Sequence, residues 1–253
     1  FIPRMPMSTL IILPTYNERD NIVALITALL ALGDDFTVCV VDDNSPDGTA
    51  QLVRDFRERE LPEADRPRVH LIVRDKKDGR GGAVRTGLQW GLEQTSPVPF
   101  DSFIEMDCDF SHPPSDIPRG LTLLQDADVV MGCRYPDGQI IGWPLHRRVL
   151  SFGANTLARC LIRWHIADYT NGFRFYSRRS AELISRLPQQ HKGYIYLSET
   201  ITAFLHYGHH IRCFPIKFVN RERGVSNTTF REVRSSLTGI FQIAWRYRFG
   251  HWD

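Results

Sequence analysis

Short apolar runs alternate with longer amphipathic stretches through the first half of this chain. The first run, from Thr9 to Leu13, carries no charge and is closed by Pro14. Runs of this form are typical of strands that are buried on both faces of a parallel sheet. The pattern predicts strands at 9–13, 36–41, 69–73, 103–106 and 128–132, and helices at 21–32, 50–60, 82–93 and 117–124, the first of them capped by Asn21. We therefore expect an α/β fold, in which helices flank a mostly parallel central sheet and ligands bind at the carboxyl ends of the strands.

The pattern changes after about residue 132. Residues 145–163 are predicted to form a helix with one apolar side and arginines elsewhere, and residues 169–176 an extended segment. Helices are expected at 181–187 and 197–207, and one strand at 210–219. No repeat or low-complexity linker separates the two parts. We therefore expect one catalytic domain, residues 8–229, with a first half at 8–132 that binds a nucleotide and a second half at 133–229 that binds an acceptor.

Residues 230–253 form a separate amphipathic element in this division. Their apolar side chains recur at helical intervals, and arginines surround them. Two interpretations stay open. The helix lies on a membrane or against a partner, or it packs on its own core while its arginines extend to solvent.

Charge is distributed unevenly along the chain. The whole sequence of 253 residues has a formal net charge of +2, which is too small to argue for nucleic acid as a partner. The segment from Gly132 to Arg179, however, contains eight arginines and only two acids, Asp137 and Asp168. This segment predicts an anionic partner, either a phosphate or a membrane surface.

The cysteines and the hydropathy of the chain argue against a disulfide-rich, a zinc-binding and a membrane-spanning protein. The five cysteines are scattered and form no Cys-x-x-Cys pair, which predicts reduced thiols in a cytosolic protein without a zinc site. No apolar run approaches the roughly 20 residues that cross a bilayer, and no signal peptide is recognisable. We excluded Phe1 to Pro6 from the fold prediction.

Two carboxylates one residue apart follow the predicted strand at 103–106. Asp107 and Asp109 precede a Pro-Pro pair that stops the strand, and the period-2 geometry of a strand end points both side chains the same way. They are either the solvated acids of a turn or the ligands of a hard divalent cation that holds a diphosphate. His112 in the same loop is better explained as a structural histidine than as a third metal ligand.

Three more loops follow predicted strands and carry polar chemistry. In the segment Pro14–Glu18, a tyrosine can stack on a base and an acid can accept from ribose hydroxyls. The acids of Asp42–Thr49 can bind a nucleoside or cap the next helix. Asp75–Gly82 combines basic side chains, glycines and a helix start, which suits a phosphate. This segment matches neither a P-loop nor a dinucleotide fingerprint.

These segments together resemble family 2 glycosyltransferases of the GT-A fold, and among them the dolichol-phosphate and polyprenol-phosphate mannose synthases. The resemblance runs in order from Thr9 to about Asn227. It rests on seven segments, which are Pro14–Glu18, Val41–Thr49, Glu105–Pro113, Gly132–Tyr135, Trp143–Asn155, Asp168–Arg174 and Arg221–Ser226.

The resemblance implies a donor site for a nucleotide sugar, with GDP-mannose expected. Asp107 and Asp109 would bind Mg²⁺ or Mn²⁺ on the diphosphate, where the metal assists the leaving group. The implied donor-binding residues are Pro14, Tyr16, Glu18, Val40, Asp42, Asp47, Lys77, Gly79, Asp107, Cys108, Asp109 and Arg134.

The resemblance also implies an acceptor, a polyprenyl or dolichyl phosphate. Its phosphate is already anionic, so it needs positioning more than deprotonation. Arg147, Arg148, Arg221 and Ser226 would hold this phosphate, and the implied catalytic residues are Asp109, Arg134, Arg148 and Arg221. In-line displacement would invert the sugar and give a β-linked product. The enzyme would work at the cytoplasmic face of the membrane, which it would reach through the 230–247 helix, a groove beside the 145–163 helix or a membrane partner subunit.

Some positions depart from the family pattern. Asn227 stands where a lysine is common, and Cys108 and Cys133 stand where Ala and Ser are usual. Two further hypotheses stay open. One is the transfer of glucose or another sugar from a UDP-sugar to polyprenyl phosphate or a soluble acceptor, and the other is a glycosyltransferase-like subunit that binds without turnover. A nucleotidyltransferase is disfavoured because Pro14–Glu18 lacks the Gly-rich basic loop that such enzymes carry.

Overall fold

The computed structural model describes residues 8–95, 98–188, 190–191, 193–220, 230–250 and 252, with the side chains of the last helix described from Thr238 onward. Its centre is a seven-stranded sheet of order β3-β2-β1-β4-β7-β5-β8, in which only β7 runs antiparallel to its neighbours. The strands are β1 (Thr9–Thr15), β2 (Phe36–Asp42), β3 (Val69–Val73), β4 (Ser102–Glu105), β5 (Val129–Cys133), β7 (Arg174–Ser177) and β8 (Ile211–Pro215).

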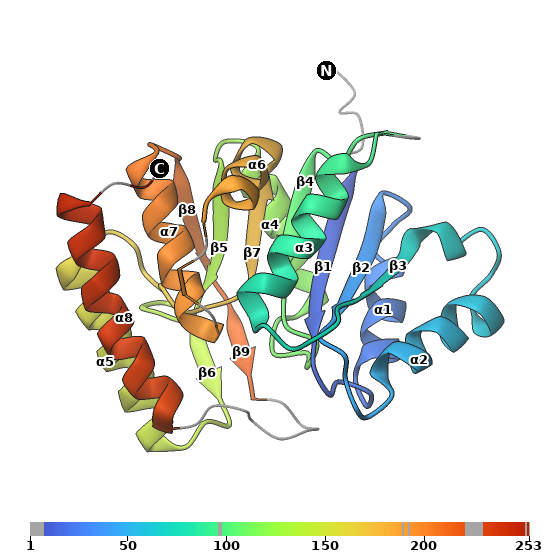
Figure 1. Cartoon of the computed structure of the whole chain (residues 1–253), viewed down its shortest axis with the longest axis horizontal. Helices are drawn as coiled ribbons and strands as arrows, with labels where there is room; N and C mark the ends of the chain where they lie inside the picture. The colour runs from blue at the N-terminus through green and yellow to red at the C-terminus, as the bar shows by residue number, and fades with distance from the viewer. Residues whose placement is uncertain are drawn as a thin grey trace.

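Helices cover both faces of this sheet, so two hydrophobic cores form (Figure 1). On one face lie α1 (Ile22–Leu30), α2 (Thr49–Asp55) and α4 (Ile117–Leu124). On the other lie α3 (Arg80–Glu93), α6 (Arg178–Arg186) and α7 (Tyr196–His206). In β1, Leu10 and Ile12 enter the second core while Ile11 and Leu13 enter the first. Burial on both faces explains why the strand is apolar at every one of these positions.

Two helices lie side by side at one end of the molecule, α5 (Leu145–Leu161) and α8 (Phe230–Phe249) (Figure 1). Single helical turns are also present, a π-helical one at Phe56–Glu60 and 3₁₀ turns at Arg66–Arg68, Pro114–Asp116 and Gly193–Ile195. Within the described ranges, no helix combines the length and the hydrophobicity that crossing a membrane requires.

Two details differ from the sequence prediction. The single strand expected at 210–219 is two strands, because the chain leaves β5 after Pro215 and continues as β9 (Lys217–Val219), which pairs with the unpredicted strand β6 (Gln139–Ile141). Asn21 precedes α1 but its side chain does not cap the helix; its amide nitrogen donates to the Glu18 carboxylate at 3.2 Å.

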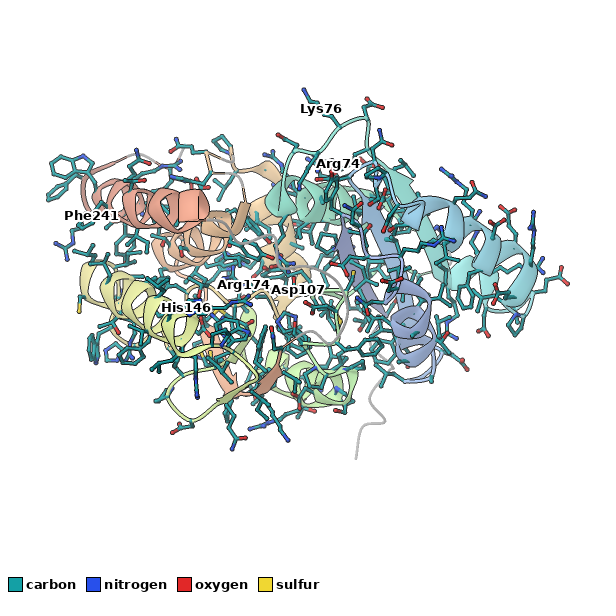
Figure 2. The ribbon with its side chains drawn as sticks, turned by 90° about the horizontal axis from the view of Figure 1, so that it is seen from below. Arg74, Lys76, Asp107, His146, Arg174 and Phe241 are labelled. Carbon is teal, nitrogen blue, oxygen red and sulfur yellow. The ribbon has the colours of Figure 1, made fainter. Side chains whose placement is uncertain are left out.

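The antiparallel direction of β7 has a consequence for the site. The carboxyl ends of parallel strands meet at one edge of the sheet, and the segment before β7 enters at that same edge. Residues 168–173 therefore lie beside the loop after β4, as the pairing of Glu105 with Arg174 requires. Figure 2 views the molecule from this side, with Asp107 and Arg174 near its middle.

Candidate active site

The loop after β4 holds Asp107 and Asp109 in a fixed turn. The Asp109 carboxylate accepts hydrogen bonds from the Ser111 amide at 3.1 Å and the Ser111 hydroxyl at 2.6 Å. Phe110 between them has a φ of 59°, in the left-handed region that tight turns use. Both aspartates are half-buried. The turn thus keeps two carboxylates at the sheet edge, as the sequence predicts.

His112 holds this loop through a hydrogen bond to its backbone. Its ring is completely buried and stacks on Phe173, with centroids 5.1 Å apart and planes at 10°. Nδ1 accepts from the Asp107 amide at 3.0 Å, and Nε2 lies 2.9 Å from the Asn171 side-chain oxygen, so we assign the proton to Nε2. Burial lowers the pKa of His112, which favours the neutral ring. With both nitrogens engaged, His112 is a structural residue in this conformation.

Arg80 also contacts this loop, which the sequence did not predict. The guanidinium donates to the Asp107 carboxylate and, at 3.0 Å, to the Gly172 carbonyl. Its Nη2 lies 3.6 Å from the buried carboxylate of Glu105. Burial alone would lower the pKa of Arg80, but the neighbouring carboxylates raise it, so the group is charged. Arg80 and Asp107 are 27 positions apart, and no spacing rule pairs them.

The predicted nucleoside site is partly assembled. The Lys77 ammonium lies 3.6 Å from the centre of the Tyr16 ring, so the loops after β1 and β3 meet as expected. Gly79 lies just before α3 with a φ of 82°, a conformation that favours glycine. Glu18, two residues after Tyr16, is tied to the start of α2, because its amide donates to the Thr49 hydroxyl at 3.1 Å.

The two acids predicted after β2 organise their own loop. Asp42 is completely buried and accepts from the Thr15 hydroxyl at 2.8 Å and the Ser45 hydroxyl at 2.6 Å. Partial burial alone would raise the pKa of Asp47, but hydrogen bonds from Thr49 and the Arg19 amide lower it. Both carboxylates therefore hold the loop in shape. Asp47 bonds to Thr49 at the start of α2, although the N-cap residue of that helix is Gly48 and no side chain caps it.

An unpredicted pair links the loops after β2 and β3. Asp43 is nearly completely buried and accepts from Arg74 at 2.7 Å and from the Asp78 amide at 3.2 Å. The pair positions the segment that carries Lys77.

Three of the predicted donor residues contribute little through their side chains. Val40 is completely buried in the core, two residues before β2 ends, so its side chain does not reach the edge where the donor is predicted. Cys108 is buried with its sulfur 3.8 Å from the Pro14 carbonyl, and burial raises the pKa of the thiol. Only the backbone of Cys108 and the half-buried Pro14 can face a donor.

Arg134 forms a buried bidentate ion pair with Asp168. Nε donates to Asp168 at 2.8 Å and Nη2 at 2.9 Å, and Nη2 also donates to the Thr170 hydroxyl at 2.6 Å. Burial alone would raise the pKa of Asp168, but Arg134 lowers it. The sequence singled out Asp168 only as part of a motif. In the structure it fixes the orientation of Arg134, and among the described residues Nη1 of Arg134 makes no hydrogen bond.

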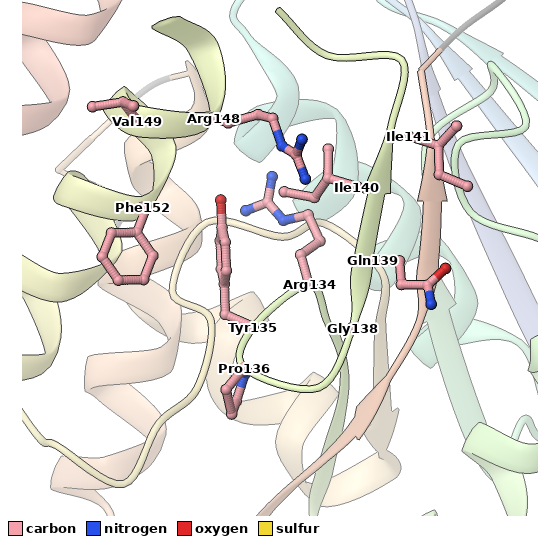
Figure 3. Close-up of a pocket in the computed structure, with 10 residues that line it drawn as sticks. All are labelled: Arg134, Tyr135, Pro136, Gly138, Gln139, Ile140, Ile141, Arg148, Val149 and Phe152. Carbon is pink, nitrogen blue, oxygen red and sulfur yellow. The ribbon is translucent and has the colours of Figure 1, made fainter. Parts of the chain in front are cut away.

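A groove of about 610 Å³ opens beside this pair, between the β5–β6 connection and α5. Figure 3 shows the guanidinium groups of Arg134 and Arg148 directed toward one another between Tyr135 and Ile140. Apolar side chains line much of the rest, among them Ile140, Val149 and Phe152. The structure therefore places Arg134, which is predicted for the donor and for catalysis, in the same groove as Arg148, which is predicted for the acceptor phosphate.

Arg147, another predicted acceptor residue, directly precedes Arg148. The Arg147 guanidinium carbon is 4.1 Å from the Trp143 ring centre, a cation–π distance. Arg147 does not line the groove. Arg221 and Ser226, the remaining predicted acceptor residues, lie outside the described residues.

The chemistry of the loop fits a hard divalent cation. Carboxylate oxygens are the ligands that Mg²⁺ and Mn²⁺ prefer, and Mg²⁺ sites usually keep water or phosphate in the remaining positions. Within the described residues, no group of three or more His, Cys, Asp or Glu side chains is placed to hold a metal. Asp107 and Asp109 would therefore have to share a cation with waters or phosphate oxygens.

The family follows from comparison with known proteins. The model of the family "Glycosyl transferase family 2" matches residues 10–184, which is more than half of the chain and includes the loop that carries Asp107 and Asp109. The chain belongs to glycosyltransferase family 2. It is thus an enzyme that transfers a sugar, and the hypothesis of a binding subunit without turnover is not supported.

Two curated family members cover nearly the whole chain. A polyprenol monophosphomannose synthase from Mycolicibacterium smegmatis is 37% identical over 95% of this chain and 87% of its own length. An undecaprenyl-phosphate mannosyltransferase from Micrococcus luteus is 35% identical over 92% of this chain and 93% of its own length.

Solved structures agree on the GT-A fold. Glucosyl-3-phosphoglycerate synthase from Mycobacterium tuberculosis, in complex with Mn²⁺, UDP-glucose and phosphoglyceric acid, superposes with a TM-score of 0.66 at 18% identity, over 94% of this chain and 80% of that one. A mannosyltransferase from Pyrobaculum calidifontis, in complex with GDP-Man and Mn²⁺, gives 0.65 at 19% identity, over 96% and 66%. The predicted fold is confirmed.

Proposed function

We propose that this family 2 glycosyltransferase moves mannose from GDP-mannose to a polyprenyl phosphate of the dolichyl type. The groove beside α5 carries this proposal, because it joins two guanidinium groups to an apolar wall. An anionic head group on a hydrocarbon chain has the matching chemistry. The two curated relatives, named for polyprenol and undecaprenyl-phosphate substrates, support the same acceptor class.

The donor lies along the carboxyl edge of β1 to β4. We assign Tyr16, Glu18 and Asp47 to the nucleoside, and Lys77 to the diphosphate. Asp107 and Asp109 would hold Mg²⁺ or Mn²⁺ there, and the bound metal would neutralise charge on the departing nucleoside diphosphate. The Pyrobaculum structure, which contains GDP-Man and Mn²⁺, supports this donor and metal class.

The chain's residues position the acceptor rather than deprotonate it. Its phosphate is ionised at neutral pH, so an oxygen can attack the anomeric carbon without a general base. Arg148 and Nη1 of Arg134 would hold that phosphate in line with the bond to be broken, together with Arg147, Arg221 and Ser226. A bond forms between acceptor oxygen and sugar carbon as the sugar–diphosphate bond breaks, its electron pair leaving with GDP. Attack from the face opposite the leaving group inverts the sugar and gives a β-linked product.

A lipid acceptor requires contact with a membrane surface. α5 exposes Leu145, Val149, Leu150 and Phe152, and α8 exposes Phe241, Trp245 and Phe249. The sequence has no Asp or Glu from 138 to 167 or from 233 to 252, whereas both stretches contain arginines. We propose that α5 and α8 rest on the cytoplasmic face of a membrane that contains anionic lipid.

A transfer assay tests the proposed reaction. Labelled GDP-mannose, UDP-glucose and UDP-N-acetylglucosamine are each incubated with a short polyprenyl phosphate, with and without Mg²⁺ or Mn²⁺. We expect metal-dependent transfer from GDP-mannose, and a loss of about 100-fold or more in the Asp109→Ala and Arg148→Ala variants.

The assay can contradict the proposal in two ways. Preferred transfer from a UDP-sugar would replace the donor. Full turnover by Arg148→Ala with the lipid acceptor would remove the groove from the acceptor site.

A further inference from the structure

Arg80 occupies a position that the proposed reaction does not explain. It carries a full positive charge directly beside Asp107, one of the two carboxylates assigned to the metal. A cation at this place repels any metal ion that approaches the same carboxylate. Its presence therefore needs a reason.

The position of Arg80 is built by its surroundings. A Cβ atom on Gly172 would lie 2.5 Å from Nη2 and 2.9 Å from the guanidinium carbon of Arg80, so only glycine leaves room for the group here. The Gly172 carbonyl accepts from the same nitrogen at 3.0 Å. The guanidinium is thus held against the segment that precedes β7.

A buried acid, Glu105, also lies close to Arg80. Glu105 is completely buried and accepts a hydrogen bond from the Tyr196 hydroxyl. Its other oxygen makes no hydrogen bond in the described part of the chain and lies 3.6 Å from Nη2 of Arg80. A buried carboxylate needs such a charge partner, so Arg80 is fixed by Glu105 and Gly172 and presents Nη1 to Asp107.

We propose that Arg80 is a built-in counter-cation that competes with the metal for Asp107, so that the metal binds tightly only together with the donor's diphosphate. The proposal rests on the assignment of Asp107 and Asp109 to the metal. Phosphate oxygens supply the negative charge and the ligands that offset repulsion by Arg80. Asp107 would thus leave Arg80 only when a metal and the nucleotide bind together, and would pair with Arg80 again after GDP departs.

Titration of Mn²⁺ binding to the full chain tests this without turnover. Free Mn²⁺ is measured by electron paramagnetic resonance with and without GDP, corrected for the Mn²⁺ that free GDP holds. In the wild type we expect GDP to raise Mn²⁺ affinity by about 100-fold. In Arg80→Met we expect Mn²⁺ to bind about 10-fold more tightly without GDP, and the effect of GDP to shrink by a similar factor.

Two further variants test whether a folding defect or the loss of any nearby cation explains the change in Mn²⁺ affinity. Arg80→Met/Glu105→Gln removes both members of the buried pair and should show the same gain in Mn²⁺ affinity without GDP. Arg85→Met removes a cation from the same helix, where Arg85 donates to the Ser185 carbonyl, and should leave Mn²⁺ binding unchanged.

The outcomes separate this proposal from the proposed function. If the wild type binds Mn²⁺ equally well with and without GDP, or if neither Arg80 variant binds it more tightly, the counter-cation role is wrong while mannosyl transfer stands. If Mn²⁺ fails to bind even with GDP, both the assignment of Asp107 and Asp109 to a metal and the proposed role of Arg80 are wrong.

Discussion

Glu199 on α7 contacts two other parts of the chain through its carboxylate. Its nearly buried carboxylate accepts from Arg246 of α8 at 3.2 Å and from the His191 amide at 3.0 Å. The His191 ring nitrogen Nδ1 lies 3.3 Å from the same carboxylate, an ion-pair distance. The residue thus joins α7, α8 and the segment before α7.

The ion pair of His191 and Glu199 predicts that the stability of the fold depends on pH. The Glu199 carboxylate raises the pKa of His191 above its usual value of 6.5, although burial partly opposes the shift. A raised pKa in the folded state stabilises the fold fully below pH 6.5, and this stabilisation is lost as the pH rises through the folded value. Relative to wild type, His191→Gln should therefore cost about 1 kcal/mol at pH 5.5 and less at pH 8.5. Urea denaturation across this range measures the difference, and a cost that does not vary with pH would contradict it.

At the residue scale, the sequence predicts which loops carry chemistry but not which side chains meet. Asp107, Asp109, Tyr16 and Lys77 each follow a strand, and the parallel topology brings their loops to one edge. Arg80 and its contact Gly172 are 92 positions apart, so no local pattern can pair them. The side chain of Val40, by contrast, lies in the core, because a strand position before the edge is covered by neighbouring elements.

Among the elements, α4 and α5 each contain a glycine whose surroundings differ. A Cβ on Gly120 in α4 would lie 2.2 Å from the ring of Phe175 in the sheet, whereas a Cβ on Gly153 in α5 meets nothing within 4 Å. The first glycine lets α4 approach β7 closely. The second has no packing role among the described residues.

Alanine substitutions should therefore act in opposite directions. Gly120→Ala should destabilise the protein by about 1–3 kcal/mol through overpacking against Phe175. Gly153→Ala should stabilise it by about 0.5–1 kcal/mol, because alanine favours a helix interior. Thermal or urea unfolding of the two variants checks the sign, and destabilisation of equal size in both would contradict this packing.

Elements with strong periodicity were predicted best. The apolar runs and amphipathic helices predicted within residues 9–133 fall within a few residues of the observed bounds. β6 was missed and the strand at 210–219 was read as one, because short strands lack a period and the change of partner after Pro215 is a tertiary event.

At the scale of the whole molecule, α5 and α8 give one end of the protein a basic, apolar surface. Glutamates in place of Phe241 and Trp245, which are 56% and 69% exposed, should abolish this surface on α8. We expect the double variant Phe241→Glu/Trp245→Glu to lose binding to vesicles that contain phosphatidylglycerol, because it removes apolar area and adds like charge.

Co-sedimentation with such vesicles measures this binding at low and high salt. Val98→Glu is the matched control, because Val98 is 57% exposed and lies in neither α5 nor α8. Equal loss in the control, or full binding by the double variant, would contradict a membrane role for α8.

The sequence did not predict the order of the strands in the sheet. It predicted only that strands and helices alternate, and it showed the resemblance to the family. β7 enters between β4 and β5 because hydrogen bonding and burial choose partners irrespective of distance along the chain. The predicted halves at 8–132 and 133–229 consequently share one sheet.

The insertion of β7 also bears on how the protein reaches its fold. β4 can pair with β1 as soon as both are synthesised, but its other edge must wait for Arg174–Ser177, and β5 has no partner until then. Contacts that close so long a loop form late. While the second half is still being synthesised, the first half would therefore expose the unpaired edge of β4. Chaperones shield such edges, and an exposed edge promotes aggregation when synthesis stalls.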